Sequence, residues 1–136
     1  MTPSLDDDGT ISEKRILVVD DEPGFLEMLR WNLKGEGVGV DVAADGLEAE
    51  WKLAEGEYAL VLTDITMPKV DGMKLLNHVK RASPRTPVIL MTGFGTVETA
   101  VQAMKDGASD FVLKPFNVDG MLARVRKILG LSVRDA

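Results

Sequence analysis

The chain has 136 residues, of which 45% are apolar, and carries 22 acidic and 16 basic side chains but no cysteine. This length and composition suit one globular domain with its own core. The net charge of -6 argues against a general nucleic-acid surface, and the lack of cysteine excludes disulfides, thiolate metal sites and cysteine nucleophiles. No apolar run has the length of a membrane span or a secretory signal, so we expect a cytoplasmic protein with no direct contact to membranes or nucleic acid.

The chain begins with a polar, acidic stretch without apolar periodicity, which predicts a flexible leader over residues 1–13. From residue 14 to residue 130, apolar runs alternate with stretches of helical spacing, which predicts one domain. The expected strands cover residues 16–19, 38–43, 60–63, 88–91 and 111–113. The expected helices cover residues 23–35, 46–54, 72–81, 96–106 and 118–129. Residues 131–136 are expected to form a C-terminal tail or the start of a linker.

Five strand-then-helix units joined by short links predict an α/β fold with a doubly wound parallel sheet. Helices are expected to cover both faces of this sheet. Trp31 and Trp51 fall on expected helices, and we expect both to be packing residues. In such sheets, functional groups gather beyond the carboxyl ends of the strands.

The residues at the expected strand ends are acids, a hydroxyl and an amine: Asp20-Asp21, Asp64, Thr92 and Lys114. Three carboxylates in one small site repel each other unless a cation compensates their charge. Because the ligands would all be oxygens, with no histidine or cysteine in these loops, Mg²⁺ fits better than zinc.

An aspartate such as Asp64 can act as a nucleophile and form an acyl phosphate when a metal and cationic side chains neutralise the transferring group. Lys114 would supply a point positive charge. Thr92 would supply a hydroxyl that bonds a phosphoryl oxygen only when the phosphoryl group is present, which makes a switch. Each residue also has a local explanation, such as a turn cap or a surface ammonium, but the combination favours phosphoryl chemistry.

Five motifs, in the right order and at suitable spacing, resemble response-regulator receivers over roughly residues 15–130. They are Val18-Val19-Asp20-Asp21-Glu22, Asp64-Ile65-Thr66-Met67-Pro68, Asp71-Gly72, Met91-Thr92-Gly93 and Lys114-Pro115-Phe116. The resemblance implies a flavodoxin-like sheet of five parallel strands in the order 2-1-3-4-5 with five helices. Other stretches, from Gly95 to Ala108 and around Asp110-Phe111, look most like receivers of the nitrogen-regulator type, which precede an ATPase module. We therefore expect either an excised receiver or a single-domain regulator.

The resemblance also implies a role for each site residue. Asp64 is the phosphoacceptor, and Thr92 and Lys114 complete the catalytic set. The Mg²⁺ ligands are Asp21 directly, Asp20 largely through water, Asp64 and the backbone carbonyl of Thr66. Phe111 matches an aromatic position that turns inward on activation, although core packing alone would also explain an aromatic there.

As such a receiver, the chain would take its phosphoryl group from a phosphohistidine of a sensor histidine kinase and would catalyse only its own phosphorylation and dephosphorylation. It would be a regulatory domain of a phosphorelay, not an enzyme with a separate substrate. The resulting conformational change would control an output domain or downstream protein, with transcription regulation as the expected output. The face of the fourth helix, fifth strand and fifth helix is the expected partner surface and a candidate homodimer surface.

Three other functions compete with this prediction. A phosphatase of the haloacid-dehalogenase type needs a second acid two residues after the nucleophile, where this chain has Thr66. A dinucleotide or flavin binder needs a glycine-rich turn in the first unit, but the spaced glycine pairs lie at residues 35 and 37 and at residues 93 and 95. A phosphorylation-independent scaffold would be expected to have lost an acid or the lysine.

Overall fold

The computed structural model describes residues 4–5, 11–12, 14–67, 70–93 and 95–131. Its main sheet has five strands, all parallel, in the order β4-β3-β5-β6-β7. The strands are β3 (Arg15–Val19), β4 (Gly39–Ala43), β5 (Leu60–Asp64), β6 (Val88–Thr92) and β7 (Asp110–Leu113). Counted from β3, this is the order 2-1-3-4-5, so the predicted doubly wound topology is confirmed.

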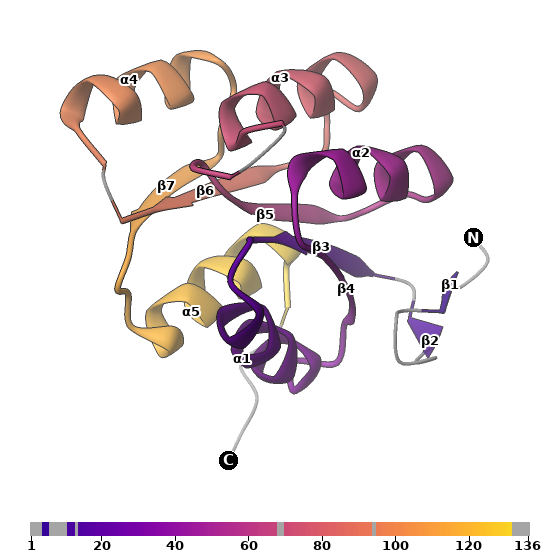
Figure 1. The fold of residues 1–136 in the computed structure, drawn as a ribbon. Helices are drawn as coiled ribbons and strands as arrows, with labels where there is room; N and C mark the ends of the chain where they lie inside the picture. The colour runs from indigo at the N-terminus through magenta and orange to yellow at the C-terminus, as the bar shows by residue number, and fades with distance from the viewer. Residues whose placement is uncertain (1–3, 6–10, 13, 68–69, 94, 132–136) are drawn as a thin grey trace.

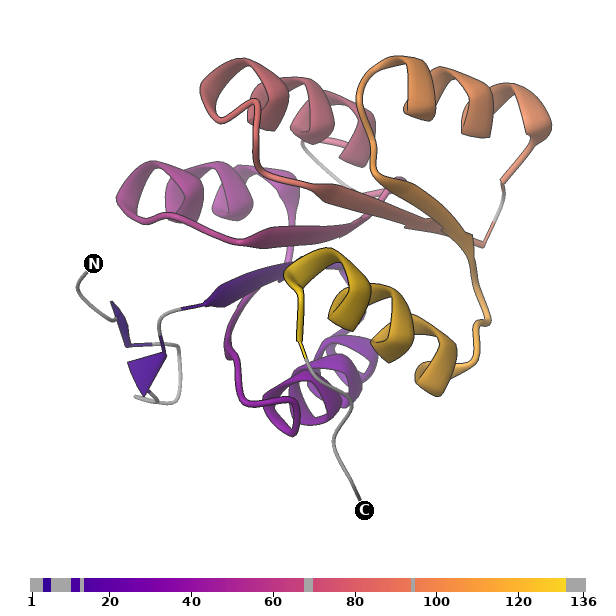
Figure 2. The same cartoon turned by 180° about the vertical axis from the view of Figure 1, so that it is seen from behind.

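Two helices cover one face of the sheet and three cover the other (Figure 1, Figure 2). The first pair is α1 (Pro23–Lys34) and α5 (Val118–Leu129), and the other three are α2 (Gly46–Glu55), α3 (Gly72–Ala82) and α4 (Val97–Lys105). Successive residues of a strand point to opposite faces. In β3, Ile16 and Val18 accordingly belong to one buried cluster and Leu17 and Val19 to the other. The sheet therefore separates two apolar cores.

The helices begin where side chains satisfy the free amide groups of the first turn. Thr96 caps α4, because its side chain accepts a hydrogen bond from the backbone N–H of Thr99 (3.0 Å). Asp45, Asp71 and Asn117 cap α2, α3 and α5 in the same way. Across the described residues, the helices lack the length and apolar character that crossing a membrane requires.

Two short strands in the predicted leader were not expected. β1 (Ser4–Leu5) and β2 (Ile11–Ser12) pair antiparallel, apart from the main sheet (Figure 1). Backbone hydrogen bonds hold such a pair together without an apolar alternation that a sequence pattern would reveal. The other leader residues, and residues 132–136 of the predicted tail, lie outside the described residues.

The prediction that the two tryptophans are packing residues is wrong. Trp31 is 82% exposed and Trp51 is 72% exposed. Each tryptophan lies two residues after a fully buried one, Leu29 in α1 and Ala49 in α2. Two residues turn a helix by about 200°, so each indole points away from the sheet.

Candidate functional site

The carboxyl ends of the central strands meet around one cavity of about 260 Å³. Its lining includes five of the seven site residues that the sequence predicted. The lining residues are Asp21, Asp64, Thr66, Thr92, Gly93 and Lys114. Asp20 is fully buried and joins the site through its carboxylate contacts. Phe111 is half-buried on β7 and is not among the lining residues, and its role as a switch residue stays a prediction.

Three carboxylates converge at this point. Asp20, Asp21 and Asp64 each place one oxygen within 4.8 Å of the others. Asp20 is held in place because its Oδ1 accepts a hydrogen bond from the backbone N–H of Glu22 (2.9 Å). Asp21 is exposed, whereas Asp64 is only 7% exposed. This oxygen-only donor set, open on one side, suits a hard divalent cation such as Mg²⁺.

Lys114 compensates part of this negative charge. Its Nζ donates a hydrogen bond to Asp20 Oδ2 (2.5 Å) and lies 3.7 Å from Asp64 Oδ2. The backbone N–H of Lys114 donates to the carbonyl of Thr92 (2.8 Å), which anchors the end of β7 to β6. The peptide bond between Lys114 and Pro115 is cis. The lysine is therefore a fixed site residue and not a free surface ammonium.

The site changes the protonation of Asp64. Burial raises the pKa of the Asp64 carboxyl above its usual value, and the nearby charges of Asp20 and Asp21 raise it further. The Lys114 ammonium opposes these effects and lowers the pKa of Asp64. A negative charge on Asp64 is thus less favourable in the folded chain than in water, and a bound cation would offset this cost.

The backbone after Asp64 turns tightly against the start of α3. The N–H of Gly72 donates to the carbonyl of Ile65 (2.8 Å). A Cβ at Gly72 would lie 2.2 Å from the Asp64 carbonyl oxygen, which no side chain could tolerate. Asp71 caps α3 by accepting from the N–H of Lys74 (2.9 Å). This close approach of the Asp64 carbonyl is a specific steric reason for glycine at position 72.

Gly95, three residues after Thr92, packs against Phe111 and Leu113. Thr92, at the end of β6, is 3% exposed. Three residues later, a Cβ at Gly95 would lie 2.4 Å from Leu113 Cδ2 and 2.9 Å from Phe111 Cε1. The backbone of Gly95 therefore lies against these two side chains. A displacement of Gly95 would displace Phe111 as well.

Sequence reasoning missed one residue of the site. Phe25 lies in the first turns of α1, and no functional prediction was made for it from the sequence. The structure places its ring 4.2 Å from Lys114 Nζ. An aromatic residue four positions after an acid pair was the available signal, but nothing in the sequence connects that position to a lysine 89 residues later.

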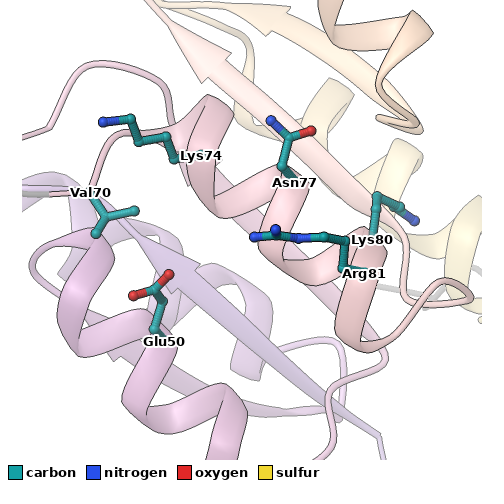
Figure 3. Close-up of a pocket in the computed structure, with 6 residues that line it drawn as sticks. All are labelled: Glu50, Val70, Lys74, Asn77, Lys80 and Arg81. Carbon is teal, nitrogen blue, oxygen red and sulfur yellow. The ribbon is translucent and has the colours of Figure 1, made fainter.

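A larger hollow lies elsewhere, between α2 and α3 (Figure 3). It has a volume of about 610 Å³. Its lining is Glu50, Val70, Lys74, Asn77, Lys80 and Arg81. The Lys80 ammonium is already used, because it donates to the carbonyl of Thr86 (2.6 Å). This hollow holds one carboxylate and none of the predicted site residues, so the acidic cavity remains the candidate site.

The family profile described as response regulator receiver domain matches residues 16–126. Among curated relatives, the transcriptional regulatory protein TcrA of Mycobacterium tuberculosis is 38% identical over 120 residues, covering 88% of this chain and 47% of TcrA. The transcriptional regulatory protein ZraR of Escherichia coli is 40% identical over 114 residues, covering 84% of this chain and 26% of ZraR. The chain thus spans less than half the length of these two relatives.

Solved structures agree with this match over most of the chain. The CheY-like response regulator receiver domain protein from Methanospirillum hungatei is 32% identical with a TM-score of 0.84, covering 88% of this chain and 95% of that one. The beryllofluoride-activated NtrC4 receiver domain dimer is 39% identical with a TM-score of 0.81, covering 85% and 96%. Its similarity agrees with the predicted nitrogen-regulator type. Fold, acidic site and sequence together show that this chain belongs to the response regulator receiver domain family, the phosphoacceptor switches of two-component systems.

Proposed function

We propose that Asp64 accepts a phosphoryl group from a phosphohistidine of a sensor histidine kinase in a Mg²⁺-dependent reaction. The observation that carries this proposal is the setting of Asp64 at the end of a central strand. Two further carboxylates have oxygens within 4.8 Å, and the Lys114 ammonium lies 3.7 Å away. A buried nucleophile beside a cation-binding cluster and a fixed ammonium is what transfer of a phosphoryl group requires.

In this reaction an Asp64 carboxylate oxygen attacks phosphorus, a P–O bond forms and the P–N bond to the histidine breaks. The imidazole leaves and takes up a proton, and Asp64 becomes an acyl phosphate. Asp20, Asp21, Asp64 and the Thr66 carbonyl would hold Mg²⁺, which neutralises charge on the phosphoryl oxygens. Lys114 would bind one phosphoryl oxygen through its ammonium, and the Thr92 hydroxyl would donate to another. Loss of the phosphoryl group by hydrolysis would return the chain to its first state.

The conformational change would begin at Thr92 and extend to the surface of the molecule. As the Thr92 hydroxyl moves toward the phosphoryl group, Gly95 would shift against Phe111 and Leu113, which it approaches closely. The surface of α4, β7 and α5 then changes. This surface carries exposed apolar side chains, namely Val97, Val101, Met104 and Leu113.

Exposed apolar side chains at such density support a partner surface. We assign it to an output domain or downstream protein, or to a second copy of the chain. The NtrC4 receiver to which this chain is similar is described as a dimer. The similar TcrA and ZraR are transcriptional regulatory proteins, which supports an output in transcription regulation.

In this proposal residues 14–130 form the receiver, residues 1–13 a leader, and residues 131–136 a tail or the start of a linker. A chain without cysteine suits the reducing cytoplasm, where we place the protein.

The test is intact mass spectrometry after incubation with acetyl phosphate and Mg²⁺. We expect the wild type to gain one phosphoryl group of about 80 Da, which EDTA prevents. Asp64→Ala should gain nothing. Asp45→Asn is the matched control, because Asp45 caps α2 and asparagine caps helices equally well. No gain in the wild type, or an equal gain in Asp64→Ala, would contradict the proposal and favour the phosphorylation-independent scaffold.

A further inference from the structure

A phenylalanine from the first helix covers the site lysine. Phe25 lies in α1, while Lys114 follows β7, and the two meet beside the Asp64 carboxylate. We propose that Phe25 is a positioning residue for phosphoryl transfer, whose ring face holds the Lys114 ammonium in reach of the phosphoryl group. This inference rests on the proposed function of Asp64 and adds a residue to it.

The geometry is that of a cation–π contact. Lys114 Nζ lies 4.2 Å from the centroid of the Phe25 ring, within the distance of about 6 Å at which the face of an aromatic ring attracts a cation. The Lys114 side chain is only 19% exposed, and such contacts strengthen when water is displaced. The ammonium therefore lies close to Asp20 at 2.5 Å, to Asp64 at 3.7 Å, and to the ring.

The ring is itself held in place. Phe116 meets Phe25 edge-to-face, with ring centroids 5.6 Å apart and planes at 74°, an arrangement that aromatic pairs favour. Both rings are half-buried and pack against the core between the sheet and the helices α1 and α5. Phe116 follows Lys114 by two residues. The aromatic pair thus connects α1 to the segment that carries the lysine, and the ring face stays turned toward the ammonium.

Such a contact suits a lysine that must change partners. Lys114 donates to Asp20 in this state, and in phosphoryl transfer it would donate to a phosphoryl oxygen on Asp64. Lysine has a flexible four-carbon stem and three rotatable donors. A ring face has no fixed hydrogen-bond direction, so the ammonium keeps this contact while its N–H groups turn from one oxygen to another. A purely aliphatic residue at position 25 would fill the space but would not attract the charge.

Three variants separate this role from packing. Phe25→Leu keeps an apolar side chain and removes the ring, Phe25→Met does the same with a flexible side chain, and Phe25→Tyr keeps the ring. We expect the first two to lower the initial rate of Asp64 phosphorylation by acetyl phosphate about two- to thirty-fold, the range that a cation–π contact supports. Phe25→Tyr should stay within about two-fold of the wild type, because tyrosine also binds cations through its face.

The decisive comparison is made in a chain without the lysine charge. In a Lys114→Gln background, Phe25→Leu should have no further effect on the phosphorylation rate, because the contact that it removes is already absent. A loss that arose from packing alone would persist in this background. A persistent loss, or a rate for Phe25→Leu and Phe25→Met equal to that of the wild type, would overturn the inference.

A spectroscopic measurement tests the contact without any reaction. Protons over an aromatic face resonate upfield, so the ε-methylene protons of Lys114 should lie upfield of ordinary lysines in the wild type and in Phe25→Tyr. The shift should vanish in Phe25→Leu. Its absence from the wild type would overturn the inference. A wild type that gains no phosphoryl group would instead refute the proposed function together with it, whereas a phosphorylated wild type that Phe25→Leu matches in rate would refute the inference alone.

Discussion

Replacing the proposed phosphoacceptor by its neutral isostere should stabilise the fold. In Asp64→Asn the side chain keeps its shape but loses a charge that the site disfavours. Burial and the neighbouring carboxylates of Asp20 and Asp21 raise the pKa of Asp64, so the ionised carboxylate weakens the folded state at neutral pH. Residues placed for function often have this cost in stability.

The size of the effect follows from the distances. At an effective dielectric constant of about 20, two like charges at 4.8 Å, the upper limit of the separations between these carboxylate oxygens, are disfavoured by roughly 3.5 kcal/mol, and Asp64 has two such neighbours. The attraction to Lys114 at 3.7 Å is worth roughly 4.5 kcal/mol on the same scale. Repulsion therefore exceeds attraction by about 2 to 3 kcal/mol. Because Asp21 is exposed and salt screens its charge, we expect a gain of about 1 to 3 kcal/mol.

Urea unfolding of both proteins at pH 7, without divalent ions, measures this gain. The raised pKa means that the folded wild type takes up a proton at a higher pH than the unfolded chain does. Its penalty is therefore full above the folded-state pKa and disappears as the pH falls toward 3.8. The advantage of Asp64→Asn should narrow over the same interval. It should also narrow as Mg²⁺ is added, because the wild type offers the metal one more carboxylate.

The electrostatic argument fails if Asp64→Asn is less stable than the wild type at pH 7 without divalent ions. It fails equally if the gain does not change as the pH falls. Asp45→Asn is again the control, because it removes a capping acid outside the cavity and should show neither the gain nor its dependence on Mg²⁺.

Three further predictions concern the packing at Gly72, a buried ion pair and the proposed switch. Gly72→Ala should lower the free energy of unfolding by about 2 to 3 kcal/mol, because its Cβ would overlap a strand carbonyl; Gly24→Ala, with open space around it, should change it by less than about 1 kcal/mol in urea titrations. Asp41→Ala should cost about 3 kcal/mol, because it removes the carboxylate that pairs with the buried Arg15 guanidinium, and a thermal unfolding midpoint equal to that of the wild type would argue against this. Thr92→Ala should still accept a phosphoryl group but lose the accompanying change in the NMR resonances of Phe111, whereas an unaltered change would remove the hydroxyl from the switch.

Much of the fold could be predicted because strands and helices leave different apolar periods in a sequence. The buried runs at Ile16–Val19 and Val88–Met91 end at polar residues. Since parallel strands bring their carboxyl ends to one edge, the grouping of Asp20, Asp64, Thr92 and Lys114 followed from the order of elements. The pairing of β1 with β2 could not be predicted, because backbone hydrogen bonds leave no such pattern.

The sequence by itself determined which elements form, in what order, and which chemical groups stand at the strand ends. Only the tertiary structure decided how those groups contact one another. Lys114 meets Asp20 across 94 residues of sequence and lies over the ring of Phe25, while Trp31 and Trp51 turn to solvent. The physical reason is that the spacing of apolar residues along a helix or strand shows which of its faces is apolar. That spacing does not show which side chains of another element the face will contact.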